Sequence, residues 1–306
     1  MRRNDAAAPG WLTFRARNTI TAYLFALPMI AGVCIFTLYP LISSLYHSFT
    51  NWSGVGAAKW VGLQNFRYLL TDDPTFWPSL KVTVYYMALS VPAGMIAGLG
   101  LAMLLNRAFA GVRVFRTIFY LPVVLPSIAV LTLWKYIFDP SYGLANEILS
   151  DLHLPTSQWL AGKWTAMPSI VVVGLWSVGG SMIIFLAALQ NVPAELYEAA
   201  RVDGAGAVRL FRSITLPMMT PILLLQLVLG LSAAFQTFNQ VQVLTKGGPG
   251  TSTNLYMFKI YNDAFGNYTQ LGLASAEAWI LLIIVLTITA LTLRTSRMWV
   301  FEGNER

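Results

Sequence analysis

The stretch VTVYYMALSVPAGMIAGLGLAMLL, residues 82–105, contains no Asp, Glu, Lys or Arg. A helix needs about 20 apolar residues to cross the hydrocarbon core of a bilayer, and this stretch is long enough. Five further runs of the same kind lie before and after it. The six predicted spans cover residues 21–45, 82–105, 118–138, 166–189, 216–238 and 276–293. The fold is therefore predicted to contain six transmembrane helices.

The composition of the whole chain supports this class. Hydrophobic residues make up 56% of the sequence and charged residues only 11%, whereas soluble domains carry about 25% charged residues. The apolar runs are continuous rather than alternating, which favours helices over the strands of a barrel. We expect an all-α integral membrane protein, with an N-terminal segment at residues 1–20, one membrane domain at residues 21–293 and a tail at residues 294–306.

The distribution of positive charge predicts the orientation. Thirteen arginines lie in the N-terminal segment, the loops after the second and fourth runs, and the tail, whereas six lysines or arginines lie in the opposite loops. Positively charged loops remain in the cytoplasm. Both termini and the loop at residues 191–217 are therefore predicted to be cytoplasmic. The net charge of +7 follows from the same bias, so we expect no nucleic-acid binding. The first run exceeds the apolar core of a signal peptide and is predicted to be retained.

Few residues in the spans offer ionic or metal chemistry. Cys34 is the only cysteine, which excludes an internal disulfide and a cysteine-cluster metal site. Lys135 and Glu277 are expected at the ends of spans, where their side chains can reach water. A proton-coupled transporter would carry ionisable groups deeper in its spans, so that class is disfavoured. We expect no catalytic residues and no bound metal.

Glycines and prolines inside the runs predict local features of the helices. Gly94 and Gly98 form a GxxxG pattern, which allows close approach of a second helix. Prolines remove backbone donors, and those in the second, third and fifth runs are expected to bend their helices. They are Pro92, Pro122, Pro126 and Pro221. The tryptophan-rich segment at residues 51–80 and the loop at residues 139–165 are expected to lie at the lipid interface.

Polar uncharged residues gather on the fourth and fifth runs. They are Ser177, Ser181, Gln226, Ser232, Gln236, Thr237 and Asn239, with Trp176 beside them. Such residues serve either as hydrogen-bonding contacts between helices or as the lining of a substrate path. Hydroxyls, amides and an aromatic face also suit a neutral, hydroxyl-rich solute such as a sugar. The residues chosen for a substrate path are Trp176, Ser177, Ser181, Gly230, Gln236, Thr237 and Asn239.

The 191–217 loop includes the patterned stretch EAARVDGAGAVRLFRSITLP, residues 198–217. Pro193 suits the start of a helix, and Gly204 can adopt the left-handed conformation that ends one. The next segment places apolar residues at helical spacing from residue 207 to residue 214. Two short helices at the cytoplasmic side would either dock into a groove of a partner or lie flat on the inner leaflet.

The same loop resembles the EAA signature of binding-protein-dependent ATP-binding-cassette (ABC) importers, and more narrowly the maltose-type, carbohydrate-uptake permeases. The matching residues of the predicted coupling site are Glu198, Ala199, Ala200, Asp203, Gly204, Ala205 and Phe211. Residues 22–52, 61–70, 115–146 and 244–265 resemble the same group. The resemblance implies the type I ABC importer fold, with a coupling helix seated in an ATPase subunit. It implies that Glu198 makes the charged contact, Ala199 packs, and Gly204 forms the turn.

The resemblance also implies the partners. No GxxxxGK[ST] phosphate loop occurs in the sequence, so ATP and magnesium are expected on two separate ATPase subunits and this chain is not expected to be an enzyme. It looks like the first-type half of a permease heterodimer in a bacterial inner membrane, supplied by an extracytoplasmic solute-binding protein. The small residues around Gly230 differ from the maltose prototype and imply a different or longer sugar. The alternatives are an importer of glycerol-phosphate esters or, less favoured, a transporter or channel without ATP coupling.

Overall fold

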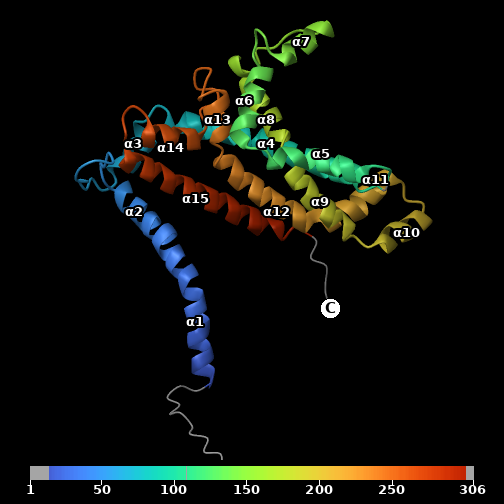
Figure 1. Cartoon of the computed structure of the whole chain (residues 1–306), viewed down its shortest axis with the longest axis horizontal. Helices are drawn as coiled ribbons and strands as arrows, with labels where there is room; N and C mark the ends of the chain where they lie inside the picture. The colour runs from blue at the N-terminus through green and yellow to red at the C-terminus, as the bar shows by residue number, and fades with distance from the viewer. Residues whose placement is uncertain (1–13, 108, 301–306) are drawn as a thin grey trace, which may run out of the picture.

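The computed structural model describes residues 14–107 and 109–300 (Figure 1). These residues are helical, apart from loops and one isolated bridge between Thr50 and Trp60. The elements are α1 (Phe14–Val33), η1 (Cys34–Leu38), α2 (Tyr39–Ser48), α3 (Gln64–Thr71), α4 (Phe76–Leu105), α5 (Val112–Val124), α6 (Ser127–Ile137), α7 (Leu144–Asp151), η2 (Trp159–Ala161), α8 (Ala166–Leu175), α9 (Gly179–Gln190), α10 (Ala194–Val202), α11 (Ala207–Leu210), η3 (Phe211–Thr215), α12 (Leu216–Phe235), α13 (Asn239–Leu244), α14 (Tyr256–Phe265) and α15 (Leu271–Ser296).

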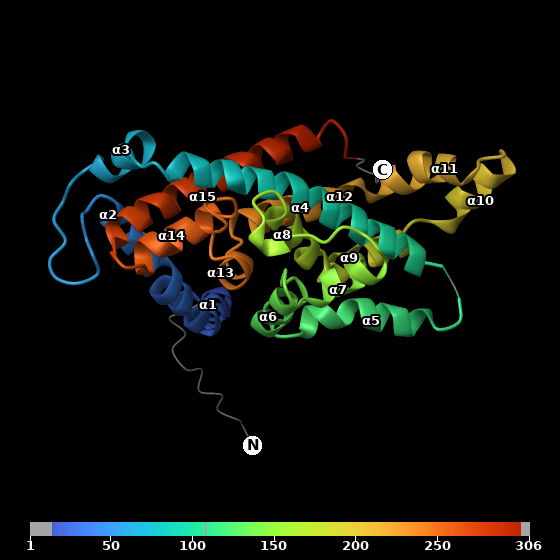
Figure 2. The ribbon, with the colours of Figure 1, turned by 90° about the horizontal axis from the view of Figure 1, so that it is seen from above.

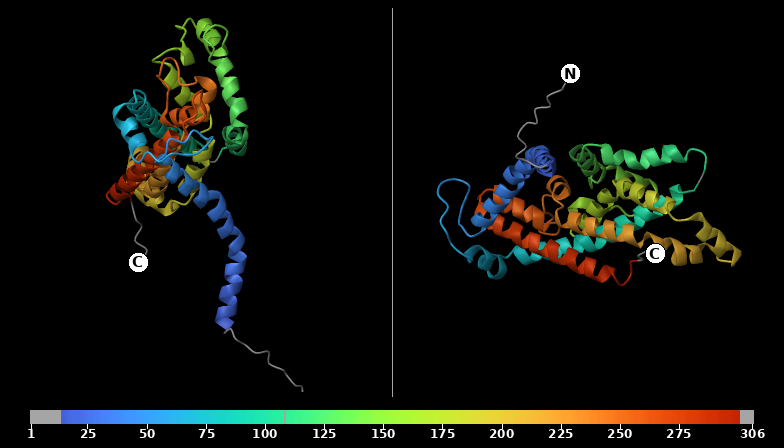
Figure 3. Two further views of the ribbon diagram at one scale, coloured as in Figure 1. Left: turned by 90° about the vertical axis from the view of Figure 1, so that its left-hand side faces the viewer. Right: turned by 90° about the horizontal axis from the view of Figure 1, so that it is seen from below.

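The long helices α4, α12 and α15 form a bundle in which α12 contacts both of the others (Figure 2). Helices α8 and α9 pack on α4, and α5 packs on α9. α10 and α11 lie at one end of this bundle, and α3 and α14 lie at the other (Figures 1 and 2). α1 extends away from the bundle (Figure 3), whereas α2 packs on α15. The chain therefore has an α10 end and an α14 end, with the long helices between them.

Four continuous helical stretches are long and apolar enough to cross a membrane. They are Asn18–Ser48, Phe76–Leu105, Ala207–Phe235 and Leu271–Ser296. The helix pairs α5–α6 and α8–α9 pass the same test only when each pair is taken as one bent span. The fold is thus all-helical with four to six candidate spans, and the predicted run at residues 82–105 begins two turns earlier, at Phe76.

The prolines of the third run break it as expected. α5 and α6 meet at 99°, and the break lies at Leu125 and Pro126. Leu125 is extended, with φ −73° and ψ 146°, as expected for a residue that precedes proline. By contrast, α4 and α12 continue through Pro92 and Pro221 without interruption.

The fourth run is also broken, without a proline at the break. α8 and α9 meet at 51°, and the connecting residues form tight turns in which Ser177 N–H bonds the Gly174 carbonyl at 3.2 Å. Gly179 begins α9 beside α5, and a Cβ atom at this position would overlap the Phe119 carbonyl. The close approach of α5 to α9 therefore requires glycine at residue 179.

The GxxxG pattern is confirmed at one of its two glycines. Gly98 is buried against α9, and an added Cβ atom would lie 2.6 Å from Ser181 Oγ and 3.3 Å from the Phe185 ring. Gly94 has no heavy atom within 4 Å of such a Cβ. The close helix approach is thus at Gly98, whereas Gly94 borders open space.

This difference predicts opposite effects of the two glycines on stability. Gly98→Val is expected to destabilise the protein by about 1–3 kcal/mol, because the added methyl groups force α4 away from α9. Gly94→Ala is expected to be neutral or slightly stabilising, since Ala is the better helix former by about 1 kcal/mol. Thermal unfolding of the two purified variants in detergent measures both effects. Equal melting temperatures would contradict the packing seen at Gly98.

Lys135 and Glu277 were both expected at span ends with access to water. Lys135 is exposed in the last turn of α6, as expected. The prediction for Glu277 is wrong, because this side chain is fully buried and paired with Lys259. The hydropathy run placed the helix start near residue 276, but α15 begins at Leu271. The preceding helix α14 then covers Glu277 and brings the lysine to it.

Candidate functional site

The 191–217 loop folds as two short helices joined by a tight turn. α10 begins directly after Pro193, and Gly204 follows its end at a φ of +75°. The Gly204 N–H bonds the Arg201 carbonyl at 3.0 Å, and the Ala205 N–H bonds the Ala200 carbonyl at 2.9 Å. These bonds form a Schellman motif, which requires a left-handed residue at this position. The conformation expected of Gly204 is confirmed.

The next turn of the loop is held to α10 by a side-chain hydrogen bond. After α11 the chain continues as the π-helical turn η3, which ends directly before α12 and two residues before Pro217. A π turn shifts the backbone bonds by one residue, and here the Leu216 N–H bonds the Phe211 carbonyl. The Tyr197 hydroxyl lies 3.0 Å from Thr215 Oγ1. This contact links α10 to the residue that directly precedes α12.

Different faces of α10 have different surroundings. One face borders a cavity of about 640 Å³ shared with the end of α4, and its residues are Ala194, Tyr197, Glu198 and Arg201. A second face, with Ala200 and Asp203, borders a groove of about 210 Å³ shared with α11 and η3. Two apolar side chains of α10, on different sides of the helix, are exposed. Val202 at the tip is 88% exposed and Leu196 is 42% exposed.

The structure brings the predicted coupling residues together at the α10 end. Glu198, Ala199, Asp203 and Gly204 are exposed, and Ala200, Ala205 and Phe211 are half-buried. An exposed apolar tip on a short helix is the surface that a partner's groove covers. The exposed end of α10 thus fits a projecting surface to which a second protein can bind.

A cavity of about 380 Å³, with hydroxyl and amide groups set among a mainly apolar lining, lies between α4, α8–α9 and α12. Of the predicted path residues, it is lined by Ser177, Ser181, Gly230 and Thr237. A Cβ atom at Gly230 would lie 3.2 Å from Val91 Cγ1. The side-chain space missing at Gly230 is therefore filled by a neighbouring helix, so this glycine adds little free volume to the cavity.

A second cavity, of about 360 Å³, holds the other predicted polar residues. Gln236 and Asn239 line it beside the break between α5 and α6. Ser177, Thr237 and Gln240 border both cavities, so the two spaces share one polar wall. Trp176 lines neither of them. Its ring lies 5.7 Å from that of Trp134, edge to face, and it is 49% exposed.

Four polar residues of the cavity were not among the predicted path residues, and one of them, Gln226 of α12, had been noted only as a polar residue of the fifth run. Tyr86 and Ser90 lie one turn apart on α4, and Gln240 lies on α13. The Tyr86 hydroxyl donates a hydrogen bond to Gln240 Oε1 at 3.0 Å and so links two distant parts of the chain. Tyrosine counts as apolar in a hydropathy run, so Tyr86 passed unnoticed. The i, i+4 spacing of Tyr86 and Ser90 was the available signal.

The chemistry of this cavity is neutral. Hydroxyl and amide groups line it from several helices, and among the described residues its lining contains no Asp, Glu, Lys, Arg or His. Hydroxyls both donate and accept, and amides offer two donors and an acceptor. The arrangement suits a solute rich in hydroxyl groups, and an ion would find no countercharge there.

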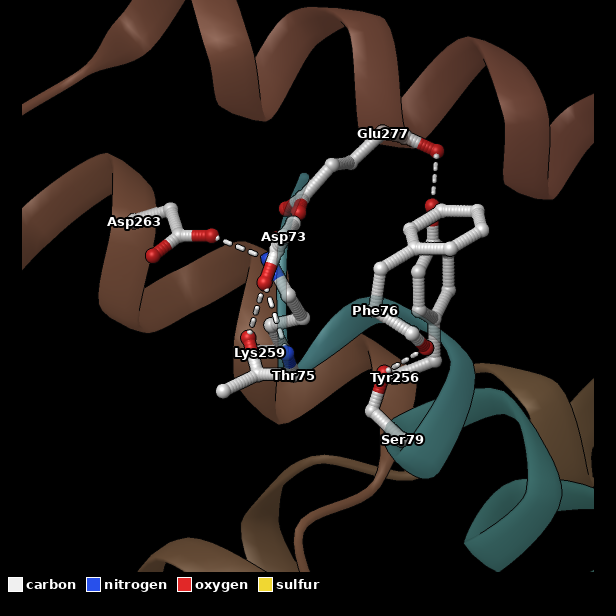
Figure 4. Close-up of polar contacts among 8 residues, drawn as sticks. All are labelled: Asp73, Thr75, Phe76, Ser79, Tyr256, Lys259, Asp263 and Glu277. Atoms are coloured by element: carbon white, nitrogen blue, oxygen red, sulfur yellow. Dashed lines mark hydrogen bonds and ion pairs between the residues drawn. The ribbon is translucent and has the colours of Figure 1, made fainter. Parts of the chain in front are cut away.

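A charged cluster at the α14 end has the spacing of a metal site. Carboxylate oxygens of Asp73, Asp263 and Glu277 lie within 4.8 Å of one another. Lys259 Nζ occupies this centre, 2.8 Å from Asp73 Oδ2 and 2.6 Å from Asp263 Oδ2, and it also bonds Glu277 Oε1 (Figure 4). The built-in ammonium therefore takes the place that a metal ion would need.

The cluster shifts the ionisation of its members that lie outside the spans. Burial favours neutral Lys259, but the surrounding carboxylates outweigh burial and raise the pKa of Lys259 above its usual value. Burial likewise disfavours ionised Asp73, but hydrogen bonds from Lys259 and Thr75 outweigh it and lower the pKa of Asp73. Thr75 donates to Asp73 Oδ1 from both its N–H and its hydroxyl, each at 2.7 Å.

The exposed loop, the candidate spans and the uncharged cavity together fit a membrane component of a transport system. Residues 90–300 match the family described as the binding-protein-dependent transport system inner membrane component. The chain belongs to this family of ABC importer permeases. It is accordingly a multi-pass protein of the bacterial cytoplasmic membrane.

Several proteins are similar to it along most of their length. The probable ABC transporter permease YesP of Bacillus subtilis is 40% identical over 94% of each chain. The trehalose/maltose transport system permease MalF of Thermococcus litoralis is 35% identical, over 92% of this chain and 95% of its own. The sn-glycerol-3-phosphate transport system permease UgpA of Yersinia pestis is 33% identical, over 89% of this chain and 92% of its own.

A solved structure shares the fold. A chain of a bacterial alginate ABC transporter, crystallised with an alginate pentasaccharide-bound periplasmic protein, superposes with a TM-score of 0.83. The alignment covers 94% of this chain and 97% of that one at 24% identity. The predicted resemblance to ABC importer permeases is thus confirmed at the level of family and fold.

Proposed function

We propose that this chain is one half of the permease of an ATP-driven importer for a neutral sugar or oligosaccharide. Its six spans would be α1–α2, α4, α5–α6, α8–α9, α12 and α15, with both termini and the 191–217 loop in the cytoplasm. The membrane domain is again residues 21–293, with the flanking segments at residues 1–20 and 294–306. The positive-inside distribution of arginines supports this orientation.

The observation that carries the proposal is the uncharged polar cavity beside the broken fourth span. Its hydroxyls and amides match the hydroxyl groups of a sugar, and MalF, a relative, is named for trehalose and maltose transport. UgpA is named for sn-glycerol-3-phosphate transport, which makes phosphate esters the second candidate. A phosphate ester would require a cation along the path. The described lining of the cavity carries none, which favours the neutral sugar.

The energy source would be separate from this chain. The exposed α10 tip would dock in an ATPase subunit that binds ATP and magnesium. Two such subunits, a second and different permease chain, and an extracytoplasmic solute-binding protein would complete the importer. Closure of the ATPase pair would move the 191–217 loop together with α12, because η3 continues directly into α12 and Tyr197 contacts Thr215 at that junction.

The proposal is tested by purifying the tagged chain from native membranes and reconstituting whatever accompanies it in liposomes. We expect an ATPase and a second permease to co-purify, and sugar uptake to require ATP and the binding protein. Uptake of glycerol-phosphate esters in place of sugars would establish the second candidate. A chain that purifies alone, or that conducts solute without ATP, would overturn the importer assignment.

Filling the cavity is expected to block transport without unfolding the protein. Gly94 borders the cavity, and an added Cβ atom meets no heavy atom within 4 Å, so Gly94→Leu is expected to extend its side chain into the open space. Ala88→Leu places the same side chain at an exposed position on the same helix and serves as the control. We expect ATP-driven uptake to be nearly lost in the first variant and retained in the second. Normal uptake by Gly94→Leu would show that solute does not pass this cavity.

A further inference from the structure

The Lys259 cluster joins three segments that are distant in sequence. Asp73 precedes α4, Lys259 and Asp263 lie on α14, and Glu277 lies in the second turn of α15 (Figure 4). All three donors of the ammonium face carboxylates, and the side chains of Lys259, Asp73 and Glu277 are at most 6% exposed. A charge network this deeply buried fixes geometry more than it adds stability, because desolvation cancels much of the attraction.

Further hydrogen bonds hold α14 in the same place. The Tyr256 N–H, at the start of α14, bonds Thr83 Oγ1 of α4 at 2.8 Å. The Tyr256 hydroxyl donates to the Glu277 backbone carbonyl at 3.1 Å. Tyr256 itself is fully buried. The first turn of α14 is therefore fixed to both α4 and α15, and Lys259 completes the attachment one turn later.

Another side of α14 contacts the polar wall of the cavities. The ring of Phe238 lies 4.5 Å from that of Tyr261 and 6.3 Å from that of Phe258. Phe238 stands between Thr237 and Asn239, directly before α13. A shift of α14 must move Phe238, because closely packed rings cannot separate without leaving a void. The position of α14 thus sets the position of Thr237 and Asn239.

We propose that Lys259 is a positioning residue for the translocation path: by fixing α14 to α4 and α15, it holds the polar groups of residues 237–240 at the cavity wall through Phe238. This inference rests on the proposed import function for its kinetic consequence only. The geometric consequence is independent of what is transported.

The geometric consequence is measured by cysteine labelling in the assembled transporter. Cys34 is the only native cysteine, so Cys34→Ala with Asn239→Cys gives a single reporter at the cavity wall. Ser150→Cys, exposed on α7, gives a control reporter away from α14. Lys259→Met is expected to change the maleimide reaction rate at residue 239 severalfold and to leave the rate at residue 150 unchanged. Lys81→Met removes an exposed lysine from α4 and is expected to change neither.

The kinetic consequence is measured with Asn239 and Cys34 intact. Lys259→Met is expected to raise the KM of ATP-driven uptake severalfold more than it lowers kcat. Lys259→Arg is expected to raise KM less than Lys259→Met does. Where Lys259→Met does not fold, Asp73→Asn removes one contact of the ammonium and is assayed with both reporters in the same way.

Each outcome decides the inference. An unchanged labelling rate at residue 239 overturns it, whatever happens to uptake, and so does an equal change at both reporters, because that reports general loosening. A selective change at residue 239 together with the KM effect supports it. Should the wild-type transporter import no sugar at all, the proposed function fails, while the labelling rates still decide whether Lys259 positions the cavity wall.

Discussion

Gly204→Val is expected to weaken binding of the ATPase partner on the order of tenfold to a hundredfold. Gly204 holds a φ of +75°, which a β-branched residue adopts only with strain. A non-glycine residue in this region costs about 1–3 kcal/mol. The strain would raise the free energy of the docking conformation by that amount relative to other conformations of the loop. The apparent affinity for the ATPase then falls with the fraction of loops that remain in the docking conformation.

The expected loss at Gly204 is a backbone effect, and the loop offers a matched control for it. An added Cβ atom has no neighbour within 4 Å at Gly204 or at Gly206, so the space at the Cβ does not distinguish the two positions. Gly206 is extended, with φ −76° and ψ 170°, a conformation that valine adopts freely. Gly206→Val therefore adds the same bulk two residues away without strain. Gly204→Asn is expected to be intermediate, since Asn tolerates the left-handed region.

The measurement is the amount of ATPase retained by each tagged variant, together with ATP-driven uptake. Gly206→Val is expected to retain both, and Gly204→Val to lose both while its melting temperature stays close to that of wild type. Equal retention by Gly204→Val and Gly206→Val would contradict the role assigned to the Schellman turn. Equal loss in both would indicate that bulk on the loop, and not its backbone conformation, prevents docking.

The 191–217 loop was predictable because its signals are local. Pro193 begins a helix, Gly204 ends it, and the apolar stripe follows within one short segment, so no distant contact decides the structure. The break in the third span was equally predictable from Pro126. The break in the fourth span was not predictable, since no proline marks the position after Leu175. Beside that break Gly179 packs against the Phe119 carbonyl, a contact between two helices that no local pattern reports.

The cavity was predictable where its polar residues stand out from apolar surroundings. Ser177, Ser181 and Thr237 were found in this way and lie at the cavity. Tyr86 and Gln240 were not, because their hydrogen bond joins residues 154 positions apart. Sequence periodicity reports which face of a helix is apolar and does not report which helices meet. The choice of Trp176 as a lining residue followed chain proximity, and the break in the helix turns it away.

The Lys259 cluster could not be predicted from local sequence patterns for the same reason. Asp73 sits in a connecting loop, Lys259 on a short amphipathic helix and Glu277 near the edge of an apolar run. In sequence each of them looks like an ordinary solvated charge. Only the packing of α14 across the ends of α4 and α15 brings them within contact distance. A buried charge is recognised from its partners, and here the partners come from three segments.

Lys259→Met is expected to lower stability by about 3–5 kcal/mol, because it leaves three carboxylates facing one another without their cation. For a protein of this size that corresponds to a fall in melting temperature on the order of 10 °C. The loss comes mainly from the unpaired charges that remain. Removing one of them should therefore restore part of the stability, so the double variant Lys259→Met with Glu277→Gln is expected to melt above Lys259→Met alone.

Thermal unfolding of the four proteins of this cycle, purified in one detergent, gives the coupling between Lys259 and Glu277 directly. Lys81→Met removes a lysine from the exposed face of α4 and is expected to melt within a few degrees of wild type, since surface substitutions typically change stability by about 0.5 kcal/mol or less. Additive effects of the two cluster variants would show that the residues do not interact. A melting temperature of Lys259→Met equal to that of Lys81→Met would show that the ammonium is solvated in the native protein. Partial recovery in the double variant would establish that the burial of Glu277 is tolerated because Lys259 is there.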